Sequence, residues 1–227
     1  MKSGKILLLF GSSGDLGTAA LNYFLTQNYD HYYIFSRNKI GTEIGKKNYD
    51  LIITENLTVE ENVAEAFAKV KKQSDLNYFL FSTIGAFFGG KSIAETEYTD
   101  LQKMIGTNFY TSFLIAKHFS ALIDGTKGGS ICFTSASSGF EPEAGKAAYN
   151  ISKNALNFLV ESLALEGKEI GLRANAVAPF AIDTPSNREW MKDLSRLISP
   201  GEICRVVQTL FGDETATGRI IPLPADL

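Results

Sequence analysis

One tyrosine and one lysine are spaced so that they can act together in proton transfer. Of the nine tyrosines, only Tyr149 is followed by a lysine four residues later, at Lys153. Side chains at positions i and i+4 share one face of a helix, and a neighbouring ammonium favours the phenolate. Lys153 is therefore predicted to lower the pKa of Tyr149 so that it exchanges protons with a carbonyl or alcohol oxygen. An isolated pair of this kind also fits a helix surface, so its context matters.

A glycine-rich segment near the N-terminus has the spacing of a diphosphate-binding loop. It reads FGSSGDLG and lies between an apolar run and an amphipathic stretch. The first glycine permits a tight turn, the second a close backbone approach to diphosphate, and the third close helix–strand packing. The helix N-terminus also favours an anion. The alternative is an ordinary turn. The residues predicted to contact a dinucleotide are Gly11, Ser13, Gly14, Asp15, Leu16 and Gly17.

The residues after the second apolar run predict NADP(H) rather than NAD(H). A carboxylate here would bind the ribose 2′-hydroxyl of NAD, but the sequence is Phe35, Ser36, Arg37, Asn38. Arg37 can pair with a 2′-phosphate, and Ser36 and Ser13 can donate hydrogen bonds to it. A merely solvated arginine would leave the missing acid unexplained.

Alternating apolar runs and amphipathic stretches predict the elements that position these residues. Strands are predicted at 6–10, 32–35, 51–54, 78–81, 130–134, 172–178 and 219–223. Helices are predicted at 16–24, 63–70, 100–123 and 147–169, and capping boxes are predicted at Thr58–Glu61 and Ser199–Glu202. Strands that are apolar throughout indicate a Rossmann-type, doubly wound parallel sheet with helices on both faces, in a single α/β domain over 1–227. Ligands of such sheets bind beyond the carboxyl ends of the strands.

Composition excludes several other classes of protein. The chain has 227 residues and a net charge of −3, which gives no basic surface for nucleic acid. Its two cysteines and two histidines provide neither a disulfide framework nor the spacing of a metal site. The first apolar run is too short for a secretory signal, and no stretch reaches membrane-span length. We expect a cytoplasmic protein with a small-molecule substrate, no metal, no nucleic acid and no membrane.

The order of these segments resembles the short-chain dehydrogenase/reductase family over nearly the whole chain. The glycine loop comes first, followed by Asn108 in a central helix, the serine-rich segment CFTSASSG, the Tyr149–Lys153 pair, and RANAVAP. The resemblance implies that Tyr149 donates or accepts the proton. It also implies that Lys153 lowers the pKa of Tyr149 and binds the nicotinamide ribose, while Asn108 holds a water in a proton relay.

The same resemblance implies further contacts to the cofactor. Leu57 occupies the position at the adenine edge, and Ile84 and Gly85 stand where the family has an Asn-Ala-Gly turn, with its first half altered. A later segment corresponds to the one that holds the carboxamide and the diphosphate. Its implied contact residues are Pro179, Ile182 and Thr184.

One position departs from the family pattern. The catalytic serine of the family falls on Ala136 in an ungapped comparison, and Ser135 and Ser137 flank it. Either serine can supply the hydroxyl if the strand end shifts by one residue, although neighbouring strand residues point to opposite faces. The alternative is that both serines only satisfy local backbone groups.

Within this family the chain looks most like the dihydropteridine reductases. The likeness rests on the glycine spacing, on GAFFGG at 85–90, on DTPSNR at 183–188, and on alanine at the family's serine position. Arg37 in place of an acid, and Asn108, depart from that group. The resemblance implies reduction of a quinonoid pterin-like ring or of a carbonyl compound. Four aromatic residues of the strand-end loops suit a flat or apolar substrate, with core packing as the alternative: Phe87, Phe88, Phe140 and Phe180.

Two other functions stay open at this point. Ala136 is compatible with a non-catalytic NADP(H)-binding regulator, but such a sensor needs no Tyr149, Lys153 and Asn108. The glycine spacing also occurs in extended epimerases and dehydratases, whose added substrate domain this chain is too short to hold.

Two expectations concern movement and assembly. The segment 187–198, with Trp190, is expected to form a mobile lid. The helix after Tyr149 is apolar on more than one face, which predicts a homodimer or homotetramer unless a neighbouring helix of the same chain covers it.

Overall fold

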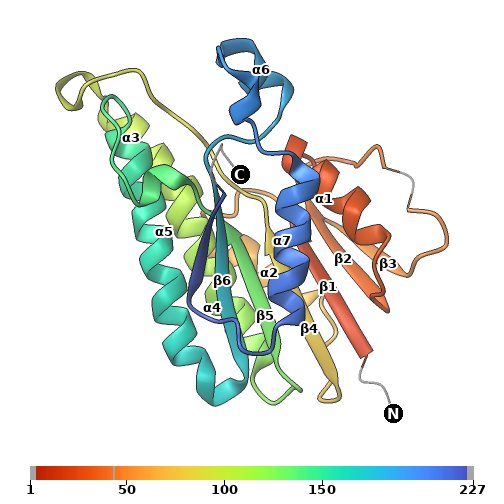
Figure 1. Cartoon of the computed structure of the whole chain (residues 1–227). Coiled ribbons are helices and arrows are strands. Elements are labelled where there is room, and N and C mark those ends of the chain that lie inside the picture. The colour runs from red at the N-terminus through yellow and green to blue at the C-terminus, as the bar shows by residue number, and fades with distance from the viewer. Residues whose placement is uncertain (1–3, 43, 224–227) are drawn as a thin grey trace.

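A single parallel sheet of seven strands organises the computed structural model, which describes residues 4–42 and 44–223 (Figure 1). Its spatial order is β3-β2-β1-β4-β5-β6-β7, and every neighbouring pair is parallel. The predicted Rossmann-type α/β fold is confirmed. The ends of the predicted domain, 1–3 and 224–227, lie outside the described residues. The strands are β1 Gly4–Phe10, β2 His31–Ser36, β3 Tyr49–Ile53, β4 Leu76–Ser82, β5 Gly129–Thr134, β6 Leu172–Pro179 and β7 Arg219–Leu223.

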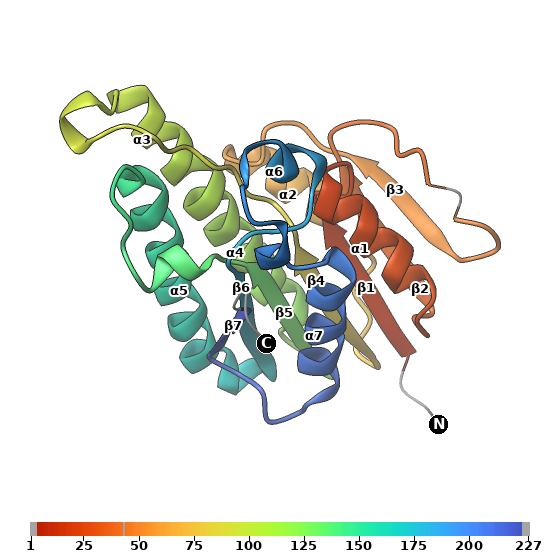
Figure 2. The same cartoon turned by 45° about the horizontal axis from the view of Figure 1, so that its top comes forward.

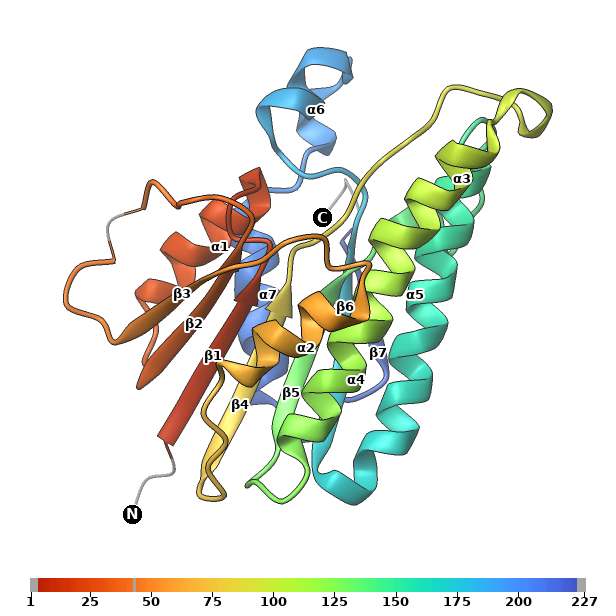
Figure 3. The ribbon, with the colours of Figure 1, turned by 180° about the vertical axis from the view of Figure 1, so that it is seen from behind.

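Helices cover both faces of this sheet, as the strand pattern predicts. On one face lie α1 (Asp15–Leu25) and α7 (Pro200–Gly212). On the other lie α2 (Glu60–Ala68), α4 (Thr111–Ile123) and α5 (Ala147–Glu166) (Figure 3). Successive side chains of a strand point to opposite faces, so each strand supplies two separate apolar cores. In β1, Leu8 and Phe10 enter the core under α2, α4 and α5, whereas Leu7 and Leu9 enter the core under α1 and α7.

The long helix predicted for 100–123 is divided in three. It consists of α3 (Tyr98–Ile105), a π-helical turn η2 (Gly106–Tyr110) and α4. A π turn adds one residue to the helical repeat, and such turns occur often at functional sites. Asn108 lies inside this turn. Apolar periodicity continues through the insertion, so the sequence pattern did not reveal it.

The two predicted capping boxes have different outcomes. Ser199 caps α7, since its hydroxyl accepts a hydrogen bond from the Glu202 amide. The box predicted at Thr58–Glu61 is wrong. The N-cap of α2 is Val59, and the Thr58 amide and hydroxyl both bind the side-chain oxygen of Asn56 instead.

A short helix, α6 (Pro185–Trp190), stands beyond the carboxyl ends of the strands (Figure 2). It interrupts the segment between β6 and α7 that was expected to be a lid. Four 3₁₀ turns complete the described chain: η1 Ile93–Glu95, η3 Ser137–Gly139, η4 Gly167–Ile170 and η5 Leu194–Arg196.

Candidate active site

The glycine loop adopts a shape that larger side chains would prevent. Gly11 has φ +84°, in the left-handed region that favours glycine. A Cβ atom on Gly17 would lie 2.0 Å from the Gly11 carbonyl oxygen, so helix α1 can approach β1 this closely only with glycine there. Gly14 is the exposed N-cap of α1, and its own Cβ would meet nothing nearer than 3.7 Å. The free amides at this helix end therefore remain open to an anion.

A cleft of about 670 Å³ runs from this loop across the carboxyl ends of β1 and β2. It lies where the strand order reverses between β1 and β4, the point at which doubly wound sheets bind nucleotides. Thr83 directly follows β4 and was not predicted as a site residue. Its hydroxyl donates to the carbonyl oxygens of Phe10 and Gly11 and so connects the end of β4 to the glycine loop. Predicted cofactor residues that line the cleft are Gly11, Ser13, Gly14, Ser36, Arg37, Leu57, Ile84 and Gly85.

The polar residues after β2 have two different roles: some face the cleft, and others shape the turn. Arg37 is exposed at the cleft, with its guanidinium free to meet an anion, and Ser13 is exposed across from it. Ser36 is buried, and its hydroxyl donates to the Asn38 carbonyl oxygen at 2.7 Å. Ser36 and Asn38 therefore shape the turn that presents Arg37, and the Ser36 proton is already committed.

Tyr149 and Lys153 lie together at the start of α5, on the wall of a second cavity of about 220 Å³. The Lys153 Nζ atom is 5.9 Å from the centre of the Tyr149 ring, as the i, i+4 spacing predicts. It donates to the Thr134 carbonyl oxygen at 2.8 Å. Only 3% of Lys153 is exposed, and this burial lowers its pKa to about 8.

The pKa of Tyr149 shifts in the direction opposite to the prediction. Burial of the phenol raises it above the ordinary tyrosine value, and the carboxylate of Glu143 raises it further. Burial, and not the ammonium of Lys153, sets the direction of the shift. Tyr149 is therefore protonated at neutral pH, the form that a proton donor requires.

Asn108 is buried behind the cavity rather than on its wall. Its side-chain oxygen accepts a hydrogen bond from the Ala86 amide at 2.8 Å. Its side-chain nitrogen donates to the Ala86 carbonyl oxygen and to the Ser152 hydroxyl. A Cβ on Gly85 would lie 3.2 Å from Lys153 Nζ and 3.4 Å from Asn108 Oδ1. The π turn thus brings Asn108 and the lysine to the same point beneath Gly85.

The serines near Ala136 are not placed as their spacing suggested. Ser135 lines the cavity, but its hydroxyl donates to the side chain of Asn157 at 2.5 Å. Ser137 starts the turn η3 and is not among the residues that line the cavity. The turn instead brings Ser138 to the cavity, next to Ala136. Strand alternation predicts nothing about a 3₁₀ turn, so Ser138 was missed.

Some of the residues predicted in the glycine loop and after β6 line the second cavity, and others have a structural role. Pro179 and Ile182 line the second cavity, together with Leu16 of the glycine loop. Thr184 is the N-cap of α6 and accepts a hydrogen bond from the Asn187 amide. Asp15 lies exposed in the first turn of α1, and Gly17 packs on Gly11.

Aromatic rings form part of the cavity wall. Phe87 and Phe180 line it as expected, while Phe88 and Phe140 lie outside it. Wall residues that were not predicted as site residues include Thr134, Glu143, Lys146, Asn187 and Trp190. Thr134 and Asn187 lie in segments that carry the family resemblance and Trp190 lies in the segment expected to be a lid, but the sequence does not show that loops distant in the chain bring these side chains to one wall.

Two further properties concern the described residues alone. Within 4–42 and 44–223, no helix combines the length and apolar character that a membrane crossing needs. The same residues hold no group of three His, Cys, Asp or Glu side chains arranged to bind a metal ion.

Comparison with known proteins shows which family this chain is similar to. A family model described as enoyl-(acyl carrier protein) reductase matches residues 36–218. Short chain aldehyde dehydrogenase 1 of Euphorbia lathyris is 28% identical over 188 residues, which make up 80% of this chain and 65% of that protein. Dihydropteridine reductase of Dictyostelium discoideum is 26% identical over 191 residues, which make up 83% of this chain and 79% of that protein.

Solved structures show the same fold. ElxO with NADP bound superposes with a TM-score of 0.86 at 24% identity, over 96% of each chain. Gox2181 superposes with a TM-score of 0.85 at 21% identity, over 99% of this chain and 95% of that one. The fold and the extent of the family match agree, so this chain belongs to the short-chain dehydrogenase/reductase family and is an NAD(P)(H)-dependent oxidoreductase.

Proposed function

We propose that this protein is an NADP(H)-dependent reductase of a carbonyl compound or a quinonoid, pterin-like ring, with Tyr149 as the proton donor. One observation carries the proposal: the phenol of Tyr149 stands on the wall of a cavity that adjoins the glycine-loop cleft. The two cavities share Thr83, Gly85 and Ala86. A group bound along both has its diphosphate at the glycine loop and its other end beside Tyr149.

The residues on these walls fit a nicotinamide dinucleotide. The glycine loop offers free amides and the space that side chains would fill, and Lys153 offers a donor for a ribose hydroxyl. When bound, the nicotinamide supplies the hydride. Tyr149 gives its proton to the substrate oxygen or nitrogen that gains charge as the hydride arrives. Lys153 and Asn108 orient the hydrogen-bonding groups that lie behind Tyr149. The protein itself accelerates the reaction by positioning the reactants and by electrostatic stabilisation.

The hydroxyl that assists Tyr149 is assigned by elimination among the three nearby serines. Ser135 has committed its proton to Asn157, and Ser137 is absent from the cavity wall. Ser138 lines the cavity and has no such partner among the described side chains. We therefore expect Ser138 to bind the substrate oxygen in place of the serine that Ala136 replaces.

The preference for NADP(H) rests on Arg37. Its exposed guanidinium stands at the end of the cleft, on a turn that Ser36 and Asn38 hold in shape. A 2′-phosphate accepts charge-assisted hydrogen bonds from such a group. No carboxylate takes the place that NAD-specific sites need.

The test is oxidation of NADPH by the purified protein with a quinonoid dihydropterin and a panel of ketones, aldehydes and quinones. Turnover should fall about 100- to 10,000-fold in Tyr149→Phe, because only the proton donor is lost. NADPH binding by the variant, measured by calorimetry, should persist. NADPH binding without any turnover would favour a regulator over a reductase, and failure to bind NADPH would contradict the proposal.

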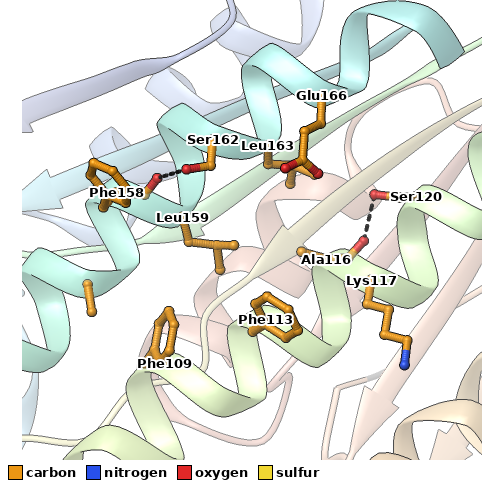
Figure 4. Close-up of a pocket in the computed structure, with 11 residues that line it drawn as sticks. Phe109, Phe113, Ala116, Lys117, Ser120, Phe158, Leu159, Ser162, Leu163 and Glu166 are labelled. Atoms are coloured by element: carbon orange, nitrogen blue, oxygen red, sulfur yellow. Dashed lines mark hydrogen bonds between the residues drawn. The ribbon is translucent and has the colours of Figure 1, made fainter.

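We also propose that the protein assembles as a homodimer or homotetramer through α4 and α5. These helices carry apolar side chains that are largely exposed to solvent: the exposed fraction is 70% for Phe158 and 67% for Leu165. Between the helices a groove of about 610 Å³ receives Phe109, Phe113 and Leu159 (Figure 4). An apolar surface of this kind is buried in a second copy of the chain. Light scattering at micromolar concentration should give at least twice the mass of 24.8 kDa, and a monomer would contradict the assembly.

A further inference from the structure

Two exposed aromatic rings form one wall of the catalytic cavity. Phe87 follows β4 and Trp190 ends α6, and their rings are nearly parallel, with an interplanar angle of 5° and centres 6.3 Å apart. Phe87 is 54% exposed and Trp190 is 56% exposed, so neither ring is packed into a core. Aromatic surface left open beside a catalytic group is available to a ligand.

The orientation of Phe87 relates this wall to Tyr149. The two rings meet edge to face, at 78° and 5.0 Å between centres. A flat molecule that stacks parallel to Phe87 is therefore also nearly perpendicular to the Tyr149 ring. Groups in the plane of that molecule, such as a ring carbonyl, then point outward along its edge, where the phenol can donate.

Trp190 is held in position by its own short helix. Thr184 caps α6, and the Asn187 side chain donates to the Ile182 carbonyl while its oxygen accepts the Trp190 indole N–H at 3.2 Å. Arg188 makes a two-bond ion pair with Asp183 across the start of the helix. Several contacts within and beside α6 therefore hold Trp190 where its ring is parallel to that of Phe87.

A charged pair stands at the edge of the aromatic wall. Lys146 Nζ donates to Glu143 Oε2 at 2.7 Å, and the same ammonium lies 5.8 Å from the centre of the Phe87 ring. Both residues line the cavity. Because their charges cancel, the pair does not select a charged substrate. It offers one hydrogen-bond donor and one acceptor side by side.

We propose, on the basis of the reductase function above, that the substrate is a small, neutral, planar conjugated ring with a lactam-like edge. Its plane lies parallel to the rings of Phe87 and Trp190, and its adjacent N–H and C=O meet Glu143 and Lys146. The cavity of about 220 Å³ also receives the nicotinamide end of the cofactor, so the ring lies between that end and the aromatic wall.

The first test uses binding alone and needs no turnover. Trp190 is the single tryptophan of the chain, so its fluorescence reports directly on this wall. The wild-type protein with NADP⁺ has no hydride to give. Isatin, a flat neutral bicycle with adjacent N–H and C=O, should quench Trp190 fluorescence saturably after correction with free tryptophan amide. The saturated ketone 1-decalone should not. Equal quenching by the two ketones, or none by isatin, would overturn the proposal.

The second test separates the aromatic wall from the polar edge by kinetics with NADPH. Phe87→Leu should reduce the selectivity for isatin over 1-decalone about tenfold, because stacking is lost while an apolar side chain remains. Phe140→Leu is the matched control: Phe140 is also an exposed aromatic, but it lies outside the cavity, so selectivity should not change. Glu143→Leu should reduce selectivity for isatin over N-methylisatin, which lacks the N–H donor.

The outcomes distinguish this inference from the proposed function. Turnover that depends on Tyr149, with selectivity unchanged in Phe87→Leu and Glu143→Leu, would leave the reductase standing and refute the ring-binding wall. Quenching of Trp190 by isatin that Phe87→Leu weakens, without turnover of any substrate, would support the wall and refute the reductase.

Discussion

The cofactor cleft and the substrate cavity meet at Gly85, yet they are built in different ways. The cleft is formed by backbone at the ends of adjacent strands, where Gly11 and Gly17 allow contacts that no side chain would permit. The cavity wall is formed by side chains from loops that are far apart in the chain, such as Phe87, Lys146 and Trp190. Backbone packing fixes the first region, whereas tertiary contacts between loops fix the second.

This difference has a consequence for function. The dinucleotide cofactor is bound at the same place in every member of such a fold, so it is bound by the cleft, whose shape the backbone packing determines. A ligand that varies is bound by loops, which change without disturbing the sheet. We therefore expect substitutions that break the close backbone packing of the cleft to alter stability and cofactor affinity together, and substitutions in the aromatic wall to alter substrate selectivity without a loss of stability.

Among substitutions that compare the cleft with the cavity wall, the largest effect is expected from Gly17→Ala in the cleft. The new Cβ would lie 2.0 Å from the Gly11 carbonyl oxygen, so α1 or the loop must move. Overpacking of this kind costs about 1–3 kcal/mol, and NADPH affinity should fall by at least about 100-fold as the loop shifts. Thermal unfolding and calorimetric titration with NADPH would measure both.

Gly14→Ala is the matched control for this substitution. Its Cβ would lie 3.7 Å from its nearest neighbour, an ordinary contact. It should leave the melting temperature unchanged within about 1 °C while lowering the affinity for NADPH. Equal destabilisation by the two alanines would mean that close packing does not define the cleft.

Arg37→Ala should weaken the binding of NADPH about 10- to 100-fold, because hydrogen bonds to a phosphate from a charged donor are lost. The KM for NADH should change little, since that cofactor has no 2′-phosphate. Steady-state kinetics with each cofactor would measure the ratio. A parallel rise of both KM values would contradict the role of Arg37 in choosing the cofactor.

The pH dependence of Lys153 tests the point where the two regions meet. Its pKa is about 8 in the folded protein, below the ordinary lysine value, because burial penalises the ammonium. If the ammonium is needed, kcat/KM should fall about tenfold per pH unit above pH 8. Tyr149 stays protonated over this range because its own pKa is raised.

Stability should change in the opposite direction. Between pH 8 and about 10.4 the unfolded chain holds the Lys153 proton that the folded chain has lost, so this lysine's contribution to the free energy of unfolding rises with pH. Below pH 8 both states are protonated and the burial penalty is fully present. Urea unfolding of the wild type and of Lys153→Met across this window would show whether the rise depends on Lys153.

The sequence predicted the region that backbone packing builds and much less of the other. The apolar runs and the three glycines follow from local steric rules, so the sheet, its helices and the cleft were foreseen. Asn108 was expected in a regular helix, because a π turn does not disturb the apolar pattern enough to be seen. The prediction of a cap at Thr58 was wrong because its amide and hydroxyl both donate to the side-chain oxygen of Asn56, two residues earlier.

Two properties of the cavity wall could not be predicted from the sequence: the position of Trp190 and the direction of the Tyr149 pKa shift. The placement of Trp190 depends on Thr184 and Asn187 in its own helix and on Phe87 from a loop about a hundred positions earlier. The direction of the Tyr149 pKa depends on burial, which a four-residue spacing does not reveal. Both properties arise only when loops assemble over the sheet.

The smallest effect is expected from the serine that compensates for Ala136. Ser138→Ala should lower kcat/KM up to about tenfold, because one hydrogen bond to the substrate oxygen is lost while Tyr149 still donates its proton. Ser137→Ala is the matched control: it lies in the same turn but not on the cavity wall, so its activity should remain near that of the wild type. A larger loss in Ser137→Ala than in Ser138→Ala would mean that the turn rearranges when substrate binds. In that case the cavity wall, unlike the cleft, would not be preformed.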